Sequence, residues 1–323
     1  MEQVGKAATA MKHAILHVIA VISNPQRYET RYELYNKFAK HVEDSGARLW
    51  TVETAFGDRP HEITASDHSQ HIQLRTSTEL WHKENMINIG ISRLPSNWEY
   101  VAWIDADVTF ARPDWALETL HQLQHYKVVQ MFSDCMDLSP DYRIVPDRAG
   151  EHLPGMMHQY VHTGGWSASL DAYKAHSGHS GYAWAARREA IDELGGLIDW
   201  SVCGANDHHM ARGLVGNILE SVHGGSSPAF KKSLQAWGDR ARQHIRGNVG
   251  YVPGLLLHHW HGSKKYRRYI DRWKILNNSQ FDPNLDIKKD SQGLYQLTGN
   301  KLRLRDDLMT YFRQRNEDCI RVD

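Results

Sequence analysis

Residues 13–22, near the start of the chain, are nearly all apolar and largely β-branched, and Ser-Asn-Pro follows them. A strand without alternation of polar and apolar residues is one that is buried on both faces. Both faces of a sheet become covered when helices connect its parallel strands. This segment therefore predicts a parallel sheet with helices packed on each side.

The segments that follow alternate between helical and strand patterns. Apolar residues recur at helical spacing in residues 29–43, whereas residues 48–54 alternate like a strand. A second helix is predicted at residues 78–91, and a buried strand at residues 100–104. This order indicates a doubly wound α/β fold, in which ligands bind beyond the carboxyl ends of the strands.

Shorter elements are predicted in the rest of the chain. We expect strands at residues 72–75, 127–132 and 181–188, and helices at residues 188–194, 207–214, 266–276 and 305–315. Residues 223–254 are rich in Gly, Ser and basic side chains, which favours a mobile loop. Residues 1–12 show little pattern, so a disordered start is predicted there.

The composition limits the class of protein. A chain of 323 residues with 41% hydrophobic content can bury a full core and is not disordered. Its cysteines, Cys135, Cys203 and Cys319, are too few and too scattered for a disulfide framework or a zinc ribbon. The apolar run at residues 14–22 is too short for a bilayer and lacks the features of a signal peptide. We therefore expect a cytoplasmic protein without a membrane span.

The charges cancel overall but are unevenly placed. Residues 231–274 hold 11 Lys and Arg and two acids, a net charge of +9, while residues 1–230 hold 19 basic and 28 acidic residues. A basic segment of this size predicts an anionic partner. The alternative is a solvated basic face that pairs with the acidic part of the chain.

Two carboxylates directly follow the predicted strand at residues 100–104. Asp105 and Asp107 are one residue apart, so both can offer oxygen ligands to a divalent cation such as Mg²⁺ or Mn²⁺. The alternative is an ordinary acidic turn, because Asp-x-Asp alone is a common sequence.

A histidine cluster supplies further candidate ligands. His258 and His261 are three residues apart within His258-His259-Trp260-His261, which leads into a run of Lys and Arg. Neutral imidazole can complete an oxygen-rich Mn²⁺ site. The alternative is a polar loop with a buried Trp and incidental histidines.

Taken in order, the motifs resemble those of the GT-A class of metal-dependent nucleotide-sugar glycosyltransferases. Within that class they are most similar to the β-1,4-galactosyltransferase and polypeptide N-acetylgalactosaminyltransferase-like branch. The matching segments, spread over about residues 13–270, are Asn24-Pro25-x-Arg27, Trp81-His-Lys83-x4-Asn88-Ile-Gly90, Asp105-Ala-Asp107, Gly204-Ala-Asn206-Asp207 and His258-x-x-His261.

The resemblance implies a fold and a domain organisation. The fold would be a GT-A, Rossmann-like mixed central sheet flanked by helices, with a C-terminal helical extension. A catalytic domain would span residues 13–262, with a nucleotide-sugar half at about 13–132 and an acceptor half at about 133–262. The basic helical extension would span residues 263–323.

The resemblance also implies a site for a UDP-sugar donor. Trp81 would stack on the uracil, although a core-filling role on its helix is the alternative. Lys83 stands where the family has Arg, and Arg27 or Arg31 would flank the same pocket. Lys264 and Arg267 would contact the leaving diphosphate. The full predicted donor set is Asn24, Pro25, Arg27, Trp81, Lys83, Asn88, Asp105, Lys264 and Arg267.

Metal ligation and catalysis follow from the same comparison. Asp107 and His261 would hold Mn²⁺, or Mg²⁺, with His258 as an alternative or extra ligand and Asp105 at the metal, its bound water or the ribose. Asp207 stands where inverting members have the general base, although a helix N-cap is the alternative. The usual Glu before that Asp is Asn206 here, and the family's Trp before the glycines is missing.

The function predicted from the sequence is therefore transfer of a sugar from a UDP-sugar to an acceptor hydroxyl, with inversion. The acceptor would be a glycan, a small molecule, a protein or a nucleic acid with hydroxylated bases. Basic and aromatic residues interleave in residues 231–274, which suits a polyanion as well as a diphosphate. A nucleotidyltransferase and an inactive sugar-nucleotide-binding module are the alternatives from other classes.

Overall fold

The computed structural model describes residues 14–146, 152–163, 178–269 and 271–322, so the predicted disordered start at residues 1–12 lies outside the described residues. Its central sheet has seven strands in the order β11-β6-β10-β4-β1-β2-β3. These strands are β1 (Leu16–Ser23), β2 (Arg48–Phe56), β3 (His71–Thr76), β4 (Tyr100–Ile104), β6 (Val128–Gln130), β10 (Ala183–Arg187) and β11 (Val249–Tyr251). Strand β10 is antiparallel to both β4 and β6, and the other neighbours are parallel.

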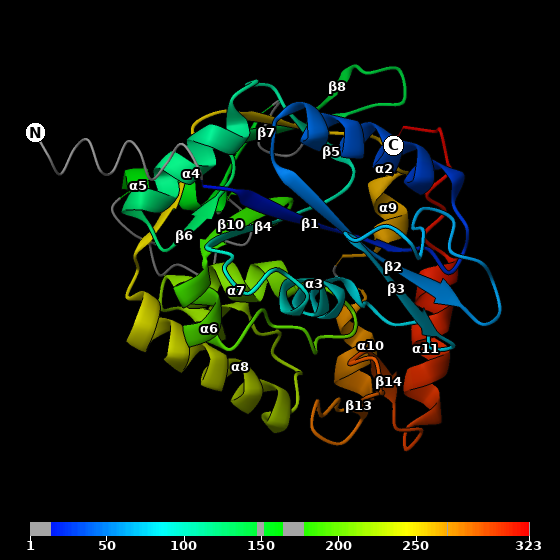
Figure 1. The fold of residues 1–323 in the computed structure, drawn as a ribbon. Coiled ribbons are helices and arrows are strands. Elements are labelled where there is room, and N and C mark those ends of the chain that lie inside the picture. Colours follow the sequence, from blue (N-terminus) through cyan, green and yellow to red (C-terminus); the bar gives the residue numbers. More distant parts are fainter. Residues whose placement is uncertain (1–13, 147–151, 164–177, 270, 323) are drawn as a thin grey trace, which may run out of the picture.

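Helices cover both faces of this mixed sheet (Figure 1). On one face lie α2 (Glu29–Asp44) and α4 (Trp115–His125), which pack against Val18 and Ala20 of β1. On the other lie α3 (Lys83–Ser92), α6 (Arg188–Leu194), α7 (Asn206–Leu214) and α8 (Pro228–Arg240), whose core includes Ile19. The strand is buried on both faces, as its apolar sequence predicts. The predicted α/β fold with a mixed central sheet flanked by helices is confirmed.

Helix α3 approaches the sheet closely at a glycine. A Cβ atom on Gly90 would lie 2.9 Å from Cγ2 of Ile19 and 3.0 Å from Cγ2 of Val52. Since real Cβ atoms do not come that close, only glycine lets the helix rest on β1 and β2 at this point. The helix begins at Lys83 rather than at residue 78, because residues 78–82 form an irregular approach to it.

A second sheet lies beside the carboxyl end of β4. It consists of β5 (Val108–Phe110), β12 (Leu255–His258), β7 (Asp134–Leu138) and β8 (Ile144–Val145), with β9 (Leu153–Pro154) paired to β7. The short helix α5 (Met156–Thr163) follows β9. Strand β12 pairs with both β5 and β7, which places His258 opposite Val108 and opposite Asp137.

The predicted loop at residues 223–254 is wrong. This interval contains α8, a five-residue π-helix over Ala241–Ile245, and β11. The Ser227 hydroxyl accepts from the backbone N–H of Phe230, and Pro228 occupies the first turn, so the helix has a regular start. Buried Phe230, Leu234 and Trp237 attach α8 to the core.

The C-terminal region is helical only in part. The predicted helix at residues 266–276 is broken into α9 (Lys264–Arg267) and α10 (Trp273–Asn278), because Arg268 takes a left-handed conformation with φ of 45°. An unpredicted hairpin of β13 (Ile287–Lys289) and β14 (Tyr295–Leu297) follows, and then α11 (Leu302–Arg313). Along the described residues, no helix combines the length and the hydropathy that crossing a bilayer requires.

Candidate functional site

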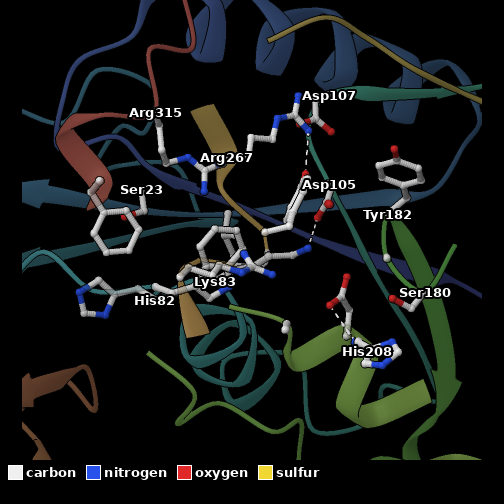
Figure 2. A pocket seen from close by; sticks show the side chains of 18 of the residues that line it. Ser23, His82, Lys83, Asp105, Asp107, Ser180, Tyr182, His208, Arg267 and Arg315 are labelled. Carbon is white, nitrogen blue, oxygen red and sulfur yellow. Dashed lines mark hydrogen bonds and ion pairs between the residues drawn. The ribbon is translucent and has the colours of Figure 1, made fainter. Parts of the chain in front are cut away.

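A cavity of about 1220 Å³ opens beyond the carboxyl ends of β1 and β4. Its walls come from the turn after β1, the approach to α3, the Asp105–Asp107 turn, the start of α7 and the C-terminal region. The predicted residues that line it are Asn24, Pro25, Trp81, Lys83, Asp105, Asp107, Asp207, His258, His261 and Arg267. Figure 2 shows Lys83 and Asp105 pointing toward one another inside this space.

Asp107, His258 and His261 form the one group among the described residues that could hold a metal ion, with ligand atoms all within 4.8 Å of one another. Asp107 Oδ2 lies 3.0 Å from His261 Nε2 and 3.9 Å from His258 Nε2. The β5–β12 pairing creates this geometry, since the backbone N–H of His259 also donates to the Asp107 carbonyl at 2.8 Å.

The chemistry of this group fits a divalent cation. The Oδ1 atom of Asp107 is buried without a hydrogen-bond partner, and the Nε2 atoms of the two histidines are 3.1 Å apart. Burial lowers the pKa of His258, which keeps its imidazole neutral as a metal ligand must be. One carboxylate and two imidazoles suit Mn²⁺ better than Mg²⁺.

The carboxylate of Asp137 orients the His258 ring by bonding its Nδ1 atom. Asp137 Oδ1 lies 2.6 Å from His258 Nδ1, and its Oδ2 lies 2.5 Å from Lys264 Nζ. Bonding of Nδ1 to a carboxylate directs Nε2 toward the candidate metal position. Lys264, predicted to contact the diphosphate, is instead placed against Asp137 and does not line the cavity.

Asp105 lies apart from the candidate metal group. Its Oδ1 forms an ion pair with Lys83 Nζ, so the two residues predicted to serve the nucleotide neutralise each other. Burial raises the pKa of Asp105 to about 6, against the opposing effect of Lys83. A direct role of Asp105 at the metal stays a prediction.

Asp207 is the second residue of α7 and lines the cavity. Its Oδ1 accepts from the backbone N–H of the next residue, His208, at 2.8 Å. Asp207 is not the N-cap residue of the helix, because that position is held by Ala205, which has no capping side chain. Gly181 leaves room for its other oxygen, because a Cβ there would lie 2.4 Å from Asp207 Oδ2. Burial would raise the pKa of Asp207, but Lys83 and His179 together hold it below its usual value. The carboxylate is therefore ionised at neutral pH, as a general base requires.

Trp81 lines the cavity with its ring already in contact with protein. Its Nε1–H donates to Glu84 at 2.9 Å, and a Cβ on Gly204 would lie 3.1 Å from its Cδ2. The guanidinium carbons of Arg315 and Arg272 lie 5.4 and 5.9 Å from the ring centroid. The indole of Trp81 thus packs against Gly204, three residues before Asp207. In the sequence, the Trp that the family has just before this glycine motif is missing. Stacking of Trp81 on a base stays a prediction.

Besides Lys264, two predicted donor residues do not line the cavity. Arg27 is an exposed side chain paired with Glu62 at 3.3 Å. Asn88 donates to the Leu197 carbonyl and to Asp199, and accepts from the Leu197 N–H, so it ties α3 to the loop after α6. Its role here is structural. Asn24 does line the cavity, but its side chain bonds both backbone groups of Tyr28 and so holds the turn after β1.

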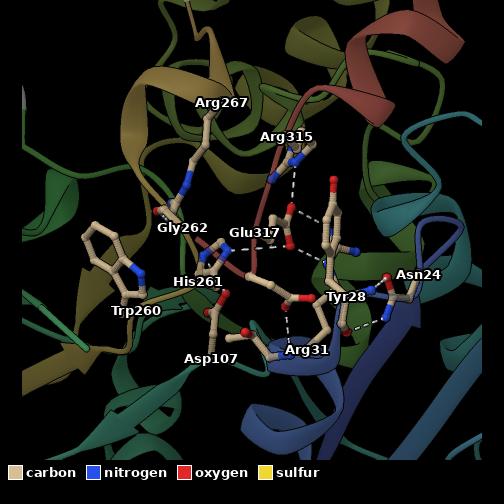
Figure 3. A network of polar contacts seen from close by, with 12 residues as sticks. Asn24, Tyr28, Arg31, Asp107, Trp260, His261, Gly262, Arg267, Arg315 and Glu317 are labelled. Carbon is tan, nitrogen blue, oxygen red and sulfur yellow. Dashed lines mark hydrogen bonds and ion pairs between the residues drawn. The ribbon is translucent and has the colours of Figure 1, made fainter. Parts of the chain in front are cut away.

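The sequence reasoning missed a buried ionic network at the C-terminus (Figure 3). Glu317, 1% exposed, accepts from Arg315 Nε at 2.6 Å and from Arg31 Nη2 at 2.7 Å. Its other oxygen lies 3.7 Å from Nδ1 of His261. No local motif marks Glu317, because Arg31 and His261 come from segments far away along the chain. Of Arg31, Arg315 and Glu317, the sequence motifs indicate only Arg31, as an alternative to Arg27.

Comparisons with known proteins give matches in structure only. No protein-family model and no curated protein sequence matches the chain. The catalytic domain of Drosophila beta-1,4-galactosyltransferase 7, solved with xylobiose, shares 10% identity, with a TM-score of 0.41 over 91% of this chain and 98% of that one. Glucosyl-3-phosphoglycerate synthase from Mycobacterium tuberculosis, solved with Mg²⁺ and UDP, shares 11% identity, with a TM-score of 0.40 over 86% of this chain and 80% of that one. A structure of S. aureus TarS shares 10% identity, with a TM-score of 0.34 over 72% of this chain and 73% of that one.

Proposed function

We propose that the protein is a metal-dependent glycosyltransferase that moves a sugar from a UDP-sugar to an acceptor hydroxyl with inversion. The observation that carries this proposal is the convergence in one cavity of the Asp107–His258–His261 group and the ionised Asp207 carboxylate. The motif order in the sequence supports the same reading, since each of the two features occupies the place that the resemblance assigns to it.

Residues on one side of the cavity would bind the metal ion and the diphosphate, and Asp207 on the other side would act on the acceptor. Asp107, His258 and His261 would hold Mn²⁺, which supplies Lewis acidity that stabilises the diphosphate as it leaves. Arg267, 6% exposed and lining the cavity, adds a fixed positive charge for the same group. Tyr182 and His179 stack in parallel with centroids 3.7 Å apart and form a rigid wall next to His258.

Asp207 would act on the acceptor. Its carboxylate takes the proton from the acceptor hydroxyl as that oxygen attacks the anomeric carbon. The bond between that carbon and the β-phosphate oxygen breaks, and UDP leaves with the electron pair. Attack from the side opposite to the diphosphate inverts the anomeric centre.

The test is UDP release from a panel of UDP-sugars, with and without Mn²⁺, in the presence of mixed hydroxylated acceptors. We expect Mn²⁺-dependent release by the wild-type chain and none by Asp107→Ala. The matched control is Asp134→Ala, which removes a carboxylate from strand β7 outside the metal group. Absence of hydrolysis and transfer with every nucleotide sugar would contradict the proposal. Formation of pyrophosphate from a nucleoside triphosphate would replace it with a nucleotidyltransferase.

A further inference from the structure

The basic segment at residues 231–274 is divided by the fold. Its Lys and Arg on α8 and the following π-helix lie on the outer surface, among them Lys232, Arg242 and Arg246, which are exposed. Arg267 and Arg272 instead are buried, 6% and 8% exposed, and both line the cavity. The inner part of the segment is therefore the part that can meet a bound substrate.

Arg272 is a buried cation for which the described part of the chain supplies no counter-charge. Among the described residues, no carboxylate lies within 4.0 Å of its guanidinium, and its Nε–H has no hydrogen-bond partner. Aromatic rings contact it instead, with Tyr269 at 5.1 Å and Trp81 at 5.9 Å from the guanidinium carbon. Aromatic contacts satisfy the face of a guanidinium but not its N–H groups, which remain free to bind an anion.

Arg272 lies at the same end of the cavity as Asp207. A Cβ on Gly204 would lie 2.9 Å from Arg272 Nη1, and Gly204 precedes Asp207 by three residues. The positive charge of Arg272 also contributes to the lowered pKa of Asp207 and of His208. Arg267 differs, because its charge acts on Asp107 and its Nη2 donates to the carbonyl of Gly262.

The charge balance of the cavity leaves one positive charge for an acceptor. Among the described residues, six basic side chains line it, against five carboxylates. The basic set is Arg31, Lys83, Arg212, Arg267, Arg272 and Arg315, and the acidic set is Asp105, Asp107, Asp207, Glu220 and Glu317. A divalent cation and the diphosphate of a nucleotide sugar carry equal and opposite charges, so they do not alter this excess. A buried unpaired cation is unfavourable, and an anionic ligand removes that cost.

We infer that Arg272 binds an acidic group, a carboxylate or a phosphate, carried by the acceptor close to the hydroxyl that Asp207 deprotonates. This inference rests on the proposed function and names its acceptor class. A buried, planar guanidinium suits one compact anionic group that it can bind with two parallel hydrogen bonds. The acceptor is thus a hydroxylated acid or a phosphorylated polyol or sugar, rather than a neutral glycan.

The experiment compares matched acceptors with the UDP-sugar that the protein turns over. The pairs are methyl glucoside with methyl glucuronide, and glycerol with glycerol 3-phosphate. For the wild-type chain we expect kcat/KM at least about tenfold higher for the acidic member, as one charge-assisted hydrogen-bonded pair supplies. In Arg272→Gln this ratio should fall toward one through a raised KM, while Arg272→Lys should recover part of it. The control is Arg242→Gln, which removes an exposed positive charge from the outer surface.

Three outcomes test the inference that Arg272 binds the acceptor. Calorimetric titration with UDP in the presence of Mn²⁺ measures the UDP affinity that distinguishes them. Loss of acid preference in Arg272→Gln with UDP affinity within about twofold of wild type supports the inference. Transfer by the wild-type chain without preference for the acidic acceptors overturns the inference and leaves the proposed function intact. A loss of UDP affinity in Arg272→Gln with an unchanged acceptor ratio also overturns it, because the anion is then the donor diphosphate.

Discussion

The Nε2 atoms of His258 and His261 face each other at 3.1 Å. Asp107 Oδ2 completes the approach at 3.0 Å from His261. Nδ1 of each ring lies near a carboxylate, Asp137 for His258 and Glu317 for His261. Such outer carboxylates fix the orientation of imidazole ligands.

Removal of the charge behind His258 should weaken metal binding without removing a ligand. Asp137→Asn replaces the carboxylate 2.6 Å from His258 Nδ1, so we expect Mn²⁺ affinity to fall roughly 10–100-fold. Electron paramagnetic resonance of free Mn²⁺ during titration measures the change. Asp134→Asn, on the same strand, is the control and should bind as wild type does. Equal affinities in the two variants would exclude an orienting role for Asp137.

Loss of Asp207, the proposed general base, should lower turnover and leave the binding of the proposed UDP-sugar donor unchanged. We expect Asp207→Asn to lower kcat roughly 10²–10⁴-fold while leaving Mn²⁺-dependent UDP affinity unchanged. Lys83 and His179 hold the pKa of Asp207 below its usual value despite burial, so wild-type kcat should be level at neutral pH and fall only in acid. Asp192→Asn, an exposed residue of α6, is the control. A variant that keeps full kcat would show that the base is another group.

Glu84 should make the protein less stable as the pH rises from mildly acidic to neutral. Burial raises its pKa to about 7, although Trp81 and Asn206 donate hydrogen bonds to it. The folded state therefore holds a proton that the unfolded state has lost, and stability falls as pH rises from about 4.5 through 7.

Glu84→Gln keeps an acceptor oxygen and cannot ionise. Relative to wild type, we expect the variant to gain on the order of 2 kcal/mol of unfolding free energy between pH 5 and pH 8. Urea denaturation at both pH values measures this gain, and Glu189→Gln on the surface should show none. A constant difference between the two pH values would mean that Glu84 is ionised throughout.

Glu317 should have the opposite pH dependence. Burial would raise its pKa, but Arg31 and Arg315 hold it well below its usual value. Its contribution to stability is therefore present above the unfolded pKa of about 4.3 and is lost as pH falls. Glu317→Gln leaves buried guanidinium groups uncompensated, so we expect a loss of about 3–5 kcal/mol at pH 7 that narrows below pH 4. Thermal unfolding across this range is the measurement, with exposed Glu43→Gln as the control. A pH-independent loss would assign the effect to packing.

The features that the sequence predicted well are those that depend on neighbouring residues. The periodicity of residues 100–104 identified β4 and its following carboxylates, and the apolar run at residues 13–22 identified β1. The spacing of His258 and His261 predicts two metal ligands; the structure brings the two imidazoles together, and their metal binding stays a prediction. In each case the physical signal, burial or ligand spacing, lies within about ten residues.

The features that the sequence did not reveal depend on distant partners. Arg27 and Arg31 have the same side chain, so the sequence does not decide which of them flanks the cavity. In the structure Arg31 lines the cavity and is bound by Glu317, which is far away along the chain. Lys264 carries the expected charge, but pairing of β12 with β7 places Asp137 next to it. The composition of residues 223–254, rich in Gly, Ser and basic residues, predicts a loop. Composition does not register the helical spacing of Phe230, Leu234 and Trp237, which are buried residues of α8.

The residues after α11 hold together parts of the chain that are made at very different times. Glu317 bonds Arg31, which precedes it by 286 positions, Asp318 accepts from the backbone N–H groups of Glu29 and Thr30, and Cys319 accepts from Trp260. During translation, α2 and the segment with the histidine cluster can therefore form these contacts only after the last residues of the chain have been made. A product that terminates before residue 315 would retain the candidate metal ligands and lack these contacts. Ribosomal stalling or a late frameshift should therefore yield chains that carry the sequence motifs but have a poorly ordered wall on this side of the cavity.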